Sequence, residues 1–143
     1  MTGTTHALVG MALGRFLHDR RQAFLMGLAA HAVLDALPHQ DYSPVVGIPL
    51  DCCGVGALLT AASRSTAPGA LAGAVGGLLP DLENLVPNRN PGRTKLFPSH
   101  WFRHNKASRR VGVAVELLTA AGATLLLCAL RGDIPETGDH RRR

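Results

Sequence analysis

Apolar stretches alternate with short polar segments along almost the whole chain of 143 residues. Each stretch has about the length of a helix, and threonine, serine or proline precedes several of them, where these residues favour a helix start. The pattern predicts an all-α fold of about five helices, at residues 4–17, 22–37, 52–62, 68–79 and 111–130. Proline and glycine in segments 41–51 and 86–98 predict loops there.

The composition indicates that these helices pack closely. Apolar residues make up 46% of the chain, but most of them are alanine, leucine and valine, and 16 glycines add to the small residues. Small side chains allow helix backbones to approach one another. We therefore expect one compact helical domain over residues 1–131, followed at 132–143 by a basic tail that is disordered.

His31 and Asp35 are polar residues in the second predicted helix, which is otherwise apolar on nearly every side. They are four positions apart, so on a helix they project from the same face and can bind a common ion. A buried carboxylate without a partner costs several kcal/mol or takes up a proton. Asp35 therefore needs a cation, a hydrogen-bond donor or water, and the pair predicts the beginning of a metal site.

Prolines at the ends of two predicted helices place further ligands in turns. Pro38 is expected to end the second helix and Pro80 the fourth, because proline removes a backbone hydrogen bond from a helix. His39 follows Pro38, and Asp81 and Glu83 follow Pro80. The last two are also explained as an ordinary acidic pair, since residues two apart on a helix do not face each other.

Histidines nearer the two ends of the chain complete the expected ligands. His6 falls in the first turn of the first helix, where a capping or surface role is the alternative. His100 and His104 are four apart on a short helix that Ser99 would cap, a spacing common in metal sites on helices. The residues predicted to converge on one metal site are His6, His31, Asp35, His39, Asp81, Glu83, His100 and His104.

The types of these ligands bear on the metal. Mixed histidine and carboxylate ligands favour Zn²⁺, with Mn²⁺ or Fe²⁺ as alternatives, whereas mainly oxygen ligands would favour Mg²⁺. The number of ligands is enough for two or more ions. Two ions a few ångströms apart could activate a shared water and stabilise both oxygens of a displacement at phosphorus.

The net charge of +5 is concentrated near the ends of the apolar stretches. This distribution fits an anionic substrate or a membrane surface, and it also fits solvated helix ends. Arg103 and Lys106 lie beside the late histidines, where they would hold phosphate oxygens. No known nucleic-acid module or basic-aromatic surface is recognisable, which argues against sequence-specific nucleic-acid binding.

Two features bear on cellular location. The N-terminus lacks the basic start, apolar middle and small-residue cleavage site of a signal peptide, and the three cysteines show no disulfide framework. Stretch 111–130 has the length that spans a bilayer, but it contains Glu116 and has basic residues on both flanks, which leave its orientation undefined. We expect a cytoplasmic or inner-membrane-associated protein without a classical signal peptide.

The order of the motifs resembles the predicted membrane-bound metal-dependent hydrolases. That family has an early Thr-His, a central Pro-Asp-x-Asp and a late His-Arg-Gly-x-Thr-His, and this chain has Thr5-His6, Pro80-Asp81-Leu82-Glu83 and a late His-x-x-x-His. Glu83 replaces the second Asp, and the late pair is one residue shorter and lacks the Gly and Thr. The helical His-x-x-x-Asp of residues 31–35 is also similar to that of zinc-dependent phospholipase C and single-strand nucleases, which are all-α trinuclear zinc enzymes.

These observations predict a metal-dependent hydrolase that acts on a phosphate ester of an anionic small molecule or lipid. Asp35 and Asp81 are the carboxylates suited to bridge two ions, and Arg103 is expected to bind the phosphate. Two alternatives stay open. One is a non-hydrolytic helical metalloprotein, such as a lyase, cyclase or isomerase, and the other is a small integral membrane protein with a structural metal site.

Overall fold

The computed structural model describes residues 1–39, 42, 44–85, 97 and 108–129 of the chain. These residues form five α-helices and no strand: α1 (Gly3–Gly14), α2 (Arg20–Ala36), α3 (Pro44–Ser63), α4 (Ala70–Leu85) and α5 (Arg109–Ala129). The all-α fold class predicted from the sequence is therefore confirmed. The tail expected at 132–143 and the short helix expected around residues 100–104 lie outside the described residues.

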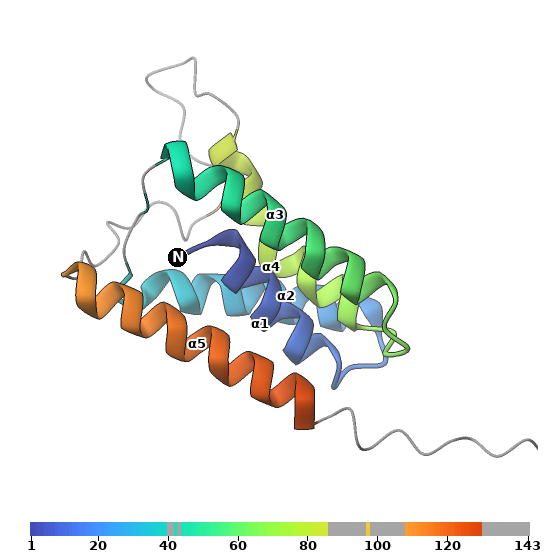
Figure 1. Cartoon of the computed structure of the whole chain (residues 1–143). Helices are drawn as coiled ribbons and strands as arrows, with labels where there is room; N and C mark the ends of the chain where they lie inside the picture. The colour runs from blue at the N-terminus through green and yellow to red at the C-terminus, as the bar shows by residue number, and fades with distance from the viewer. Residues whose placement is uncertain (40–41, 43, 86–96, 98–107, 130–143) are drawn as a thin grey trace, which may run out of the picture.

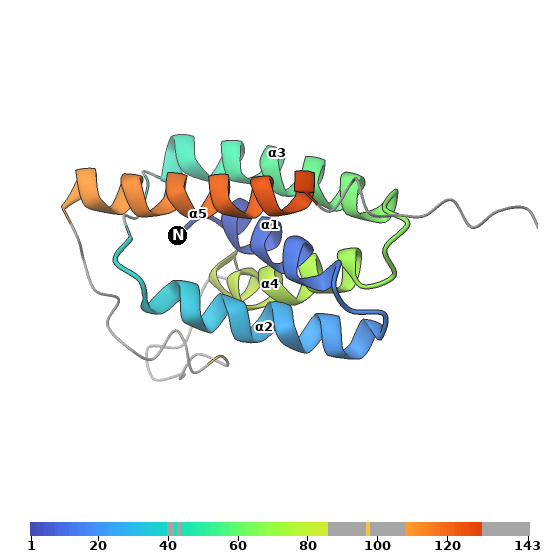
Figure 2. The same ribbon diagram turned by 90° about the horizontal axis from the view of Figure 1, so that it is seen from below.

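Consecutive helices run in opposite directions, so that α1, α3 and α5 point one way and α2 and α4 point the other way (Figure 1). α1 is central, because it packs against all four other helices. Figure 2 shows α3 and α5 along one side of the bundle and α2 along the opposite side. This arrangement places the first turn of α1 at the same end of the bundle as the last turns of α2 and α4.

Side chains at the helix starts explain where α1 and α2 begin. The hydroxyl of Thr2 accepts a hydrogen bond from the N–H of Thr5 and so caps α1. Asp19 caps α2 by accepting hydrogen bonds from the N–H groups of Arg21 and Gln22. Such side chains satisfy first-turn donors that have no partner within the helix. Both helices therefore begin one or two residues earlier than the sequence pattern predicts.

The start of α3 corrects the prediction of a loop over residues 41–51, because residues 44–51 are helical. Pro44 is the first helical residue, where a missing N–H costs nothing, and Pro49 removes only the hydrogen bond to the carbonyl of Val45. Asp51 in this segment accepts hydrogen bonds from the start of α1, which anchors the segment on the bundle. The two prolines therefore shape the start of a helix here and do not prevent it.

α4 also corrects the prediction, because it continues through Pro80 instead of ending before it. The side chain of Pro80 is fully buried, and this burial offsets the backbone hydrogen bond that Pro80 cannot donate to Gly76. As a result, Asp81 and Glu83 lie within the helix and not in a turn. They project in different directions, because they are two residues apart.

Glycines set the distance between α1 and α4. Gly69, which directly precedes α4, and Gly73 and Gly77 within α4 recur every four residues and face α1. A Cβ atom built on Gly73 would overlap the backbone carbonyl of Gly10, and a Cβ atom built on Gly10 would overlap that of Gly73. The two backbones are thus in direct contact, and the buried apolar residues around them are mainly alanine. This is the close packing that the composition predicts.

Candidate metal centre

His6, His31 and Asp35 meet inside the bundle, and all three are buried. His6 comes from the start of α1, whereas His31 and Asp35 lie one turn apart near the end of α2. His6 Nε2 lies 3.3 Å from Asp35 Oδ1, and His31 Nε2 lies 3.0 Å from Asp35 Oδ2. One possible ligand atom of each residue lies within 4.8 Å of the other two. Three donors at this separation can bind a single metal ion.

The two imidazole rings of this group are stacked on each other. The ring centroids of His6 and His31 are 4.0 Å apart and the ring planes differ by 27°. Each ring faces a different oxygen of the Asp35 carboxylate. The stack therefore directs the Nε2 atoms of two different helices toward one carboxylate.

The Nδ1 atom of His31 determines what its Nε2 atom can do. Nδ1 lies 2.7 Å from the carbonyl oxygen of Gly77 in α4, and because a carbonyl only accepts, Nδ1 carries a proton. Nε2, beside Asp35 Oδ2, then either carries a second proton or presents a lone pair. In the first case an imidazolium pairs with Asp35. In the second case a cation is needed, because the lone pair and the carboxylate repel each other.

Burial and pairing with Asp35 have opposite effects on these groups. Burial lowers the pKa of His6, and the hydrogen bond with Asp35 does not offset it. Burial also acts to lower the pKa of His31, but the hydrogen bond and charge of Asp35 outweigh it, so that this pKa is raised. Burial acts to raise the pKa of Asp35, but hydrogen bonds from His31 and His6 hold it well below its usual range. Without a metal, these shifts favour an ionised Asp35 paired with a protonated His31, and they favour the neutral form of His6.

The donor atoms fit a divalent metal ion. His6 Nε2 has only the 3.3 Å contact with Asp35 Oδ1, and no hydrogen-bond partner of His6 Nδ1 is found among the described residues. A metal–ligand bond would satisfy Nε2 more fully. Two imidazoles and one carboxylate suit Zn²⁺, and they also suit Fe²⁺ or Mn²⁺. A structural zinc site has four protein ligands, so the three donors found among the described residues leave at least one coordination position to be filled.

Asp81 of α4 lies beside this group. A Cβ atom built on Gly3 would lie 3.4 Å from Asp81 Oδ2, so the carboxylate is next to the first turn of α1. Its negative charge favours the protonated forms of His6 and His31 and so acts to raise the pKa of both. Asp81 is not one of the three residues whose ligand atoms lie within 4.8 Å of one another. The structure therefore places it near the centre but outside the closest group.

The other predicted ligands have different surroundings. His39 is buried, and its Nδ1 atom lies 2.9 Å from the carbonyl oxygen of Leu37. Glu83 projects from a different face of α4 than Asp81 does. Neither His39 nor Glu83 belongs to the three-residue group found in the described part of the chain. Three predicted site residues lie outside the described residues, namely His100, Arg103 and His104.

Three residues near the centre do not stand out as ligands in the sequence. Gly77 accepts the hydrogen bond from His31, and a Cβ atom built on it would overlap the carbonyl oxygen of His6, so it contacts both histidines. Asp51 and Glu116 bind the first turn of α1, which carries His6. Asp51 is the only charged residue of α3, and Glu116 is the only charged residue of α5 after the two arginines at its start. This isolation is the signal that could have identified the two acids as groups with a buried partner.

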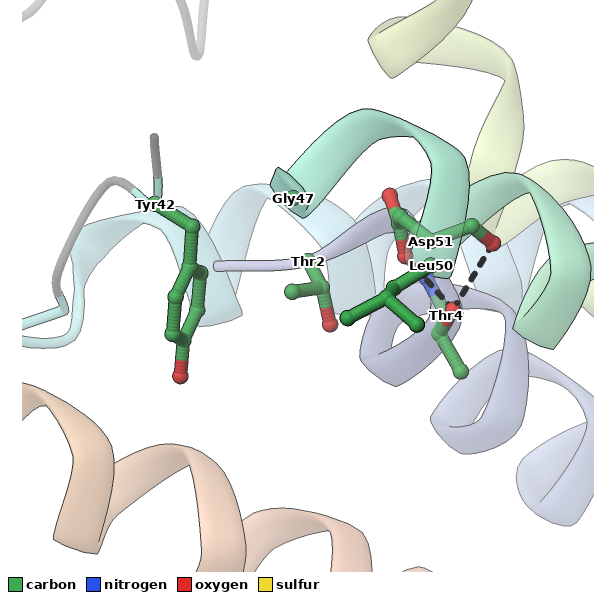
Figure 3. Close-up of a pocket in the computed structure, with 6 residues that line it drawn as sticks. All are labelled: Thr2, Thr4, Tyr42, Gly47, Leu50 and Asp51. Carbon is green, nitrogen blue, oxygen red and sulfur yellow. Dashed lines mark hydrogen bonds between the residues drawn. The ribbon is translucent and has the colours of Figure 1, made fainter. Parts of the chain in front are cut away.

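A pocket with a volume of about 240 Å³ lies beside the first turn of α1 (Figure 3). Its lining consists of Thr2, Thr4, Tyr42, Gly47, Leu50 and Asp51. Asp51 is hydrogen-bonded to Thr4 in this wall. None of the predicted metal ligands is among the lining residues, so the pocket is distinct from the metal centre.

Comparisons with known proteins give no match, because no family model, no curated protein and no solved structure matches this chain. The centre is therefore interpreted from its own geometry and from the sequence motifs.

Proposed function

We propose that this chain is a metal-dependent hydrolase acting on a phosphate ester, with His6, His31 and Asp35 as metal ligands. The observation that carries the proposal is that ligand atoms of these three buried residues lie within 4.8 Å of one another. A metal ion bound there would lower the pKa of a water molecule and polarise a phosphoryl oxygen. The motif order that resembles membrane-bound metal-dependent hydrolases includes His6 and Asp81 and supports the same class of reaction.

The chain's own residues orient the proposed centre. The carbonyl of Gly77 holds His31 Nδ1, which turns His31 Nε2 toward Asp35. Asp35 supplies negative charge beside the Nε2 atoms of the two stacked rings and keeps its charge because its pKa is held well below the usual range. Asp81, whose charge acts on both histidines, is the residue we propose as a ligand of a second ion.

The preference for a phosphate ester rests on the sequence around the late histidines. Arg103 and Lys106 carry positive charge there, and a guanidinium binds phosphate oxygens through two parallel hydrogen bonds. Both residues lie outside the described residues. The proposed substrate is accordingly an anionic small molecule or lipid with an ester bond to phosphorus.

Hydrolysis of an aryl phosphodiester tests this function. The metal-free protein should be inactive, added Zn²⁺ or Mn²⁺ should restore turnover, and Asp35→Asn should abolish it. Arg103→Ala should retain the metal and act mainly by raising KM, because it removes binding of the phosphate. Full metal occupancy without turnover of phosphate monoesters or diesters would overturn the hydrolase assignment and favour a lyase, cyclase, isomerase or structural metal site.

The outer helices favour association of this hydrolase with a membrane. Val45–Ser63 in α3 has 19 residues with a mean hydropathy of 1.8, and Arg109–Ala129 has 21 residues with a mean hydropathy of 2.0. Only 6% of the first segment and 17% of the second are buried within the bundle. Both segments match a hydrocarbon thickness of about 30 Å. We propose that α3 and α5 contact lipid. The same two helices would contact lipid if the chain were instead a small membrane protein with a structural metal site.

A further inference from the structure

Glu116 of α5 connects that outer helix to the backbone of His6. Glu116 Oε1 accepts a hydrogen bond from the N–H of Thr2 at 2.8 Å and another from the hydroxyl of Thr5 at 3.1 Å. The carbonyl of Thr2 in turn accepts a hydrogen bond from the N–H of His6 at 3.2 Å. Thr2 therefore links the Glu116 carboxylate to the backbone of His6, a proposed metal ligand, because it donates a hydrogen bond to the first and accepts one from the second.

Asp51 of α3 binds the same turn of α1 from another direction. Its Oδ1 atom accepts hydrogen bonds from the N–H of Thr4 at 2.7 Å and from the Thr4 hydroxyl at 2.5 Å. Its Oδ2 atom accepts a hydrogen bond from the N–H of Gly3 at 2.9 Å. Both oxygens of Asp51 thus accept hydrogen bonds, whereas Glu116 accepts those of Thr2 and Thr5 through one oxygen, Oε1.

These contacts fix the part of α1 that carries His6. First-turn N–H groups have no partner within a helix, and the helix dipole favours negative charge beside them. His6 is the only member of the three-residue group that α2 does not supply. The separation of His6 from His31 and Asp35 therefore depends on where the first turn of α1 is held.

We infer that Asp51 and Glu116 are positioning residues of the metal centre. They hold the start of α1 so that His6 Nε2 lies within reach of the ion bound by His31 and Asp35. The inference rests on the proposed metal function, but it does not depend on the reaction that the metal serves. It gives α3 and α5 a role in the centre although neither helix supplies one of its three ligands.

Binding of Co²⁺ tests the inference without an activity assay, because the visible absorption of bound Co²⁺ reports its coordination. Glu116→Gln retains an acceptor oxygen for Thr2 and Thr5 and should bind Co²⁺ nearly as the parent does. Glu116→Ala removes that acceptor and should weaken binding by about tenfold or more, the effect typical of residues that support a metal ligand. Its Co²⁺ spectrum should also change, because His6 moves away from the ion.

Asp51 should show the opposite response to a conservative change. Asp51→Asn places an amide NH₂ group against one of the backbone or hydroxyl donors, since both carboxylate oxygens accept hydrogen bonds. We therefore expect Asp51→Asn to weaken Co²⁺ binding about as much as Asp51→Ala. The contrast between Glu116→Gln and Asp51→Asn follows from the hydrogen-bond pattern and not from charge alone.

The matched control is Asp19→Ala, which removes the N-cap of α2 at the other end of that helix from His31. It should lower Tm but leave the Co²⁺ affinity and spectrum unchanged. If Glu116→Ala does not fold, Thr5→Val takes its place. It loses the hydroxyl contacts of Thr5 with Glu116 and Thr2 but keeps the bond from the Thr2 N–H to Glu116, so it should show a smaller loss of affinity.

The possible failures of the two proposals can be told apart. Absence of Co²⁺ binding by the parent would overturn the proposed metal function itself. Tight binding by the parent, together with unchanged affinity and spectrum in Asp51→Asn and in Glu116→Ala or Thr5→Val, would overturn only the positioning role.

Discussion

At the scale of single residues, the centre is defined by the two nitrogens of His31. Nδ1 is committed to Gly77, so Nε2 must meet Asp35 through either a proton or a cation. The same three side chains can therefore form a buried ion pair without metal and a metal site with it. This explains how the bundle tolerates these polar groups in its interior in both states.

The first prediction concerns metal content and stability. Zinc should raise Tm of the parent, because a ligand that binds only the native state stabilises that state. At a free zinc concentration of 100 times Kd, the free energy of unfolding should rise by about 2.7 kcal/mol. Asp35→Asn should lose both the bound zinc and the zinc-dependent rise in Tm. The measurements are metal analysis after dialysis and thermal unfolding with zinc and with EDTA.

His18→Ala is the control for this experiment, since His18 is exposed and lies before α2 at the far end from the centre. It should keep the parent's zinc content and the parent's shift in Tm. Equal zinc content in Asp35→Asn and the parent would remove Asp35 from the ligands.

At the scale of helices, glycine contacts bring the two halves of the centre together. α1 supplies His6 and α2 supplies His31 and Asp35, while α4 lies against both helices. Gly73 of α4 contacts both helices. It lies against Gly10 of α1, and a Cβ atom built on Gly27 of α2 would overlap the carbonyl oxygen of Gly73. Larger residues at these positions would separate the helices that carry the ligands.

The second prediction follows from this packing. Gly73→Ala should lower the free energy of unfolding by about 1–3 kcal/mol, as overpacking of a close contact does, and should weaken metal binding. Gly56→Ala is the matched control, because a Cβ atom at Gly56 of α3 would meet nothing within 4 Å. Since alanine favours a helix over glycine, Gly56→Ala should stabilise the protein by about 0.5–1 kcal/mol. Denaturant unfolding measures both, and equal stability of the two variants would contradict the packing argument.

The sequence predicts some of these features better than others. Hydrophobic periodicity identifies five helices and local spacing identifies His31 and Asp35 as one unit, because both signals act within a helix. The prolines mislead, since the cost of Pro49 and Pro80 depends on position and burial, which the local pattern does not contain. The partnership of His6 with Asp35 depends on contacts between helices, so the sequence contains only the candidates.

At the scale of the whole molecule, the apolar surface and the metal centre are connected through α1. The two long apolar helices, α3 and α5, lie on the same side of the bundle, and both pack on α1 (Figure 2). The single acidic side chain of α5, Glu116, is directed into the bundle and is buried. The charge that argues against a membrane location in the sequence is therefore kept from the outer surface of α5 and is hydrogen-bonded to α1.

The last prediction is that α3 and α5 bind the protein to lipid through their apolar surfaces. Val45 of α3 is 83% exposed and Leu118 of α5 is 73% exposed, so both are available to a bilayer. The protein should float with vesicles of neutral lipid and should stay bound in high salt, because burial of apolar surface is not screened as charge attraction is. Replacing both residues by lysine should release it, while Arg64→Ala should not, since Arg64 follows the end of α3. Binding that requires anionic lipid and disappears in salt would instead indicate attachment through the basic helix ends, and no flotation at all would overturn the membrane association.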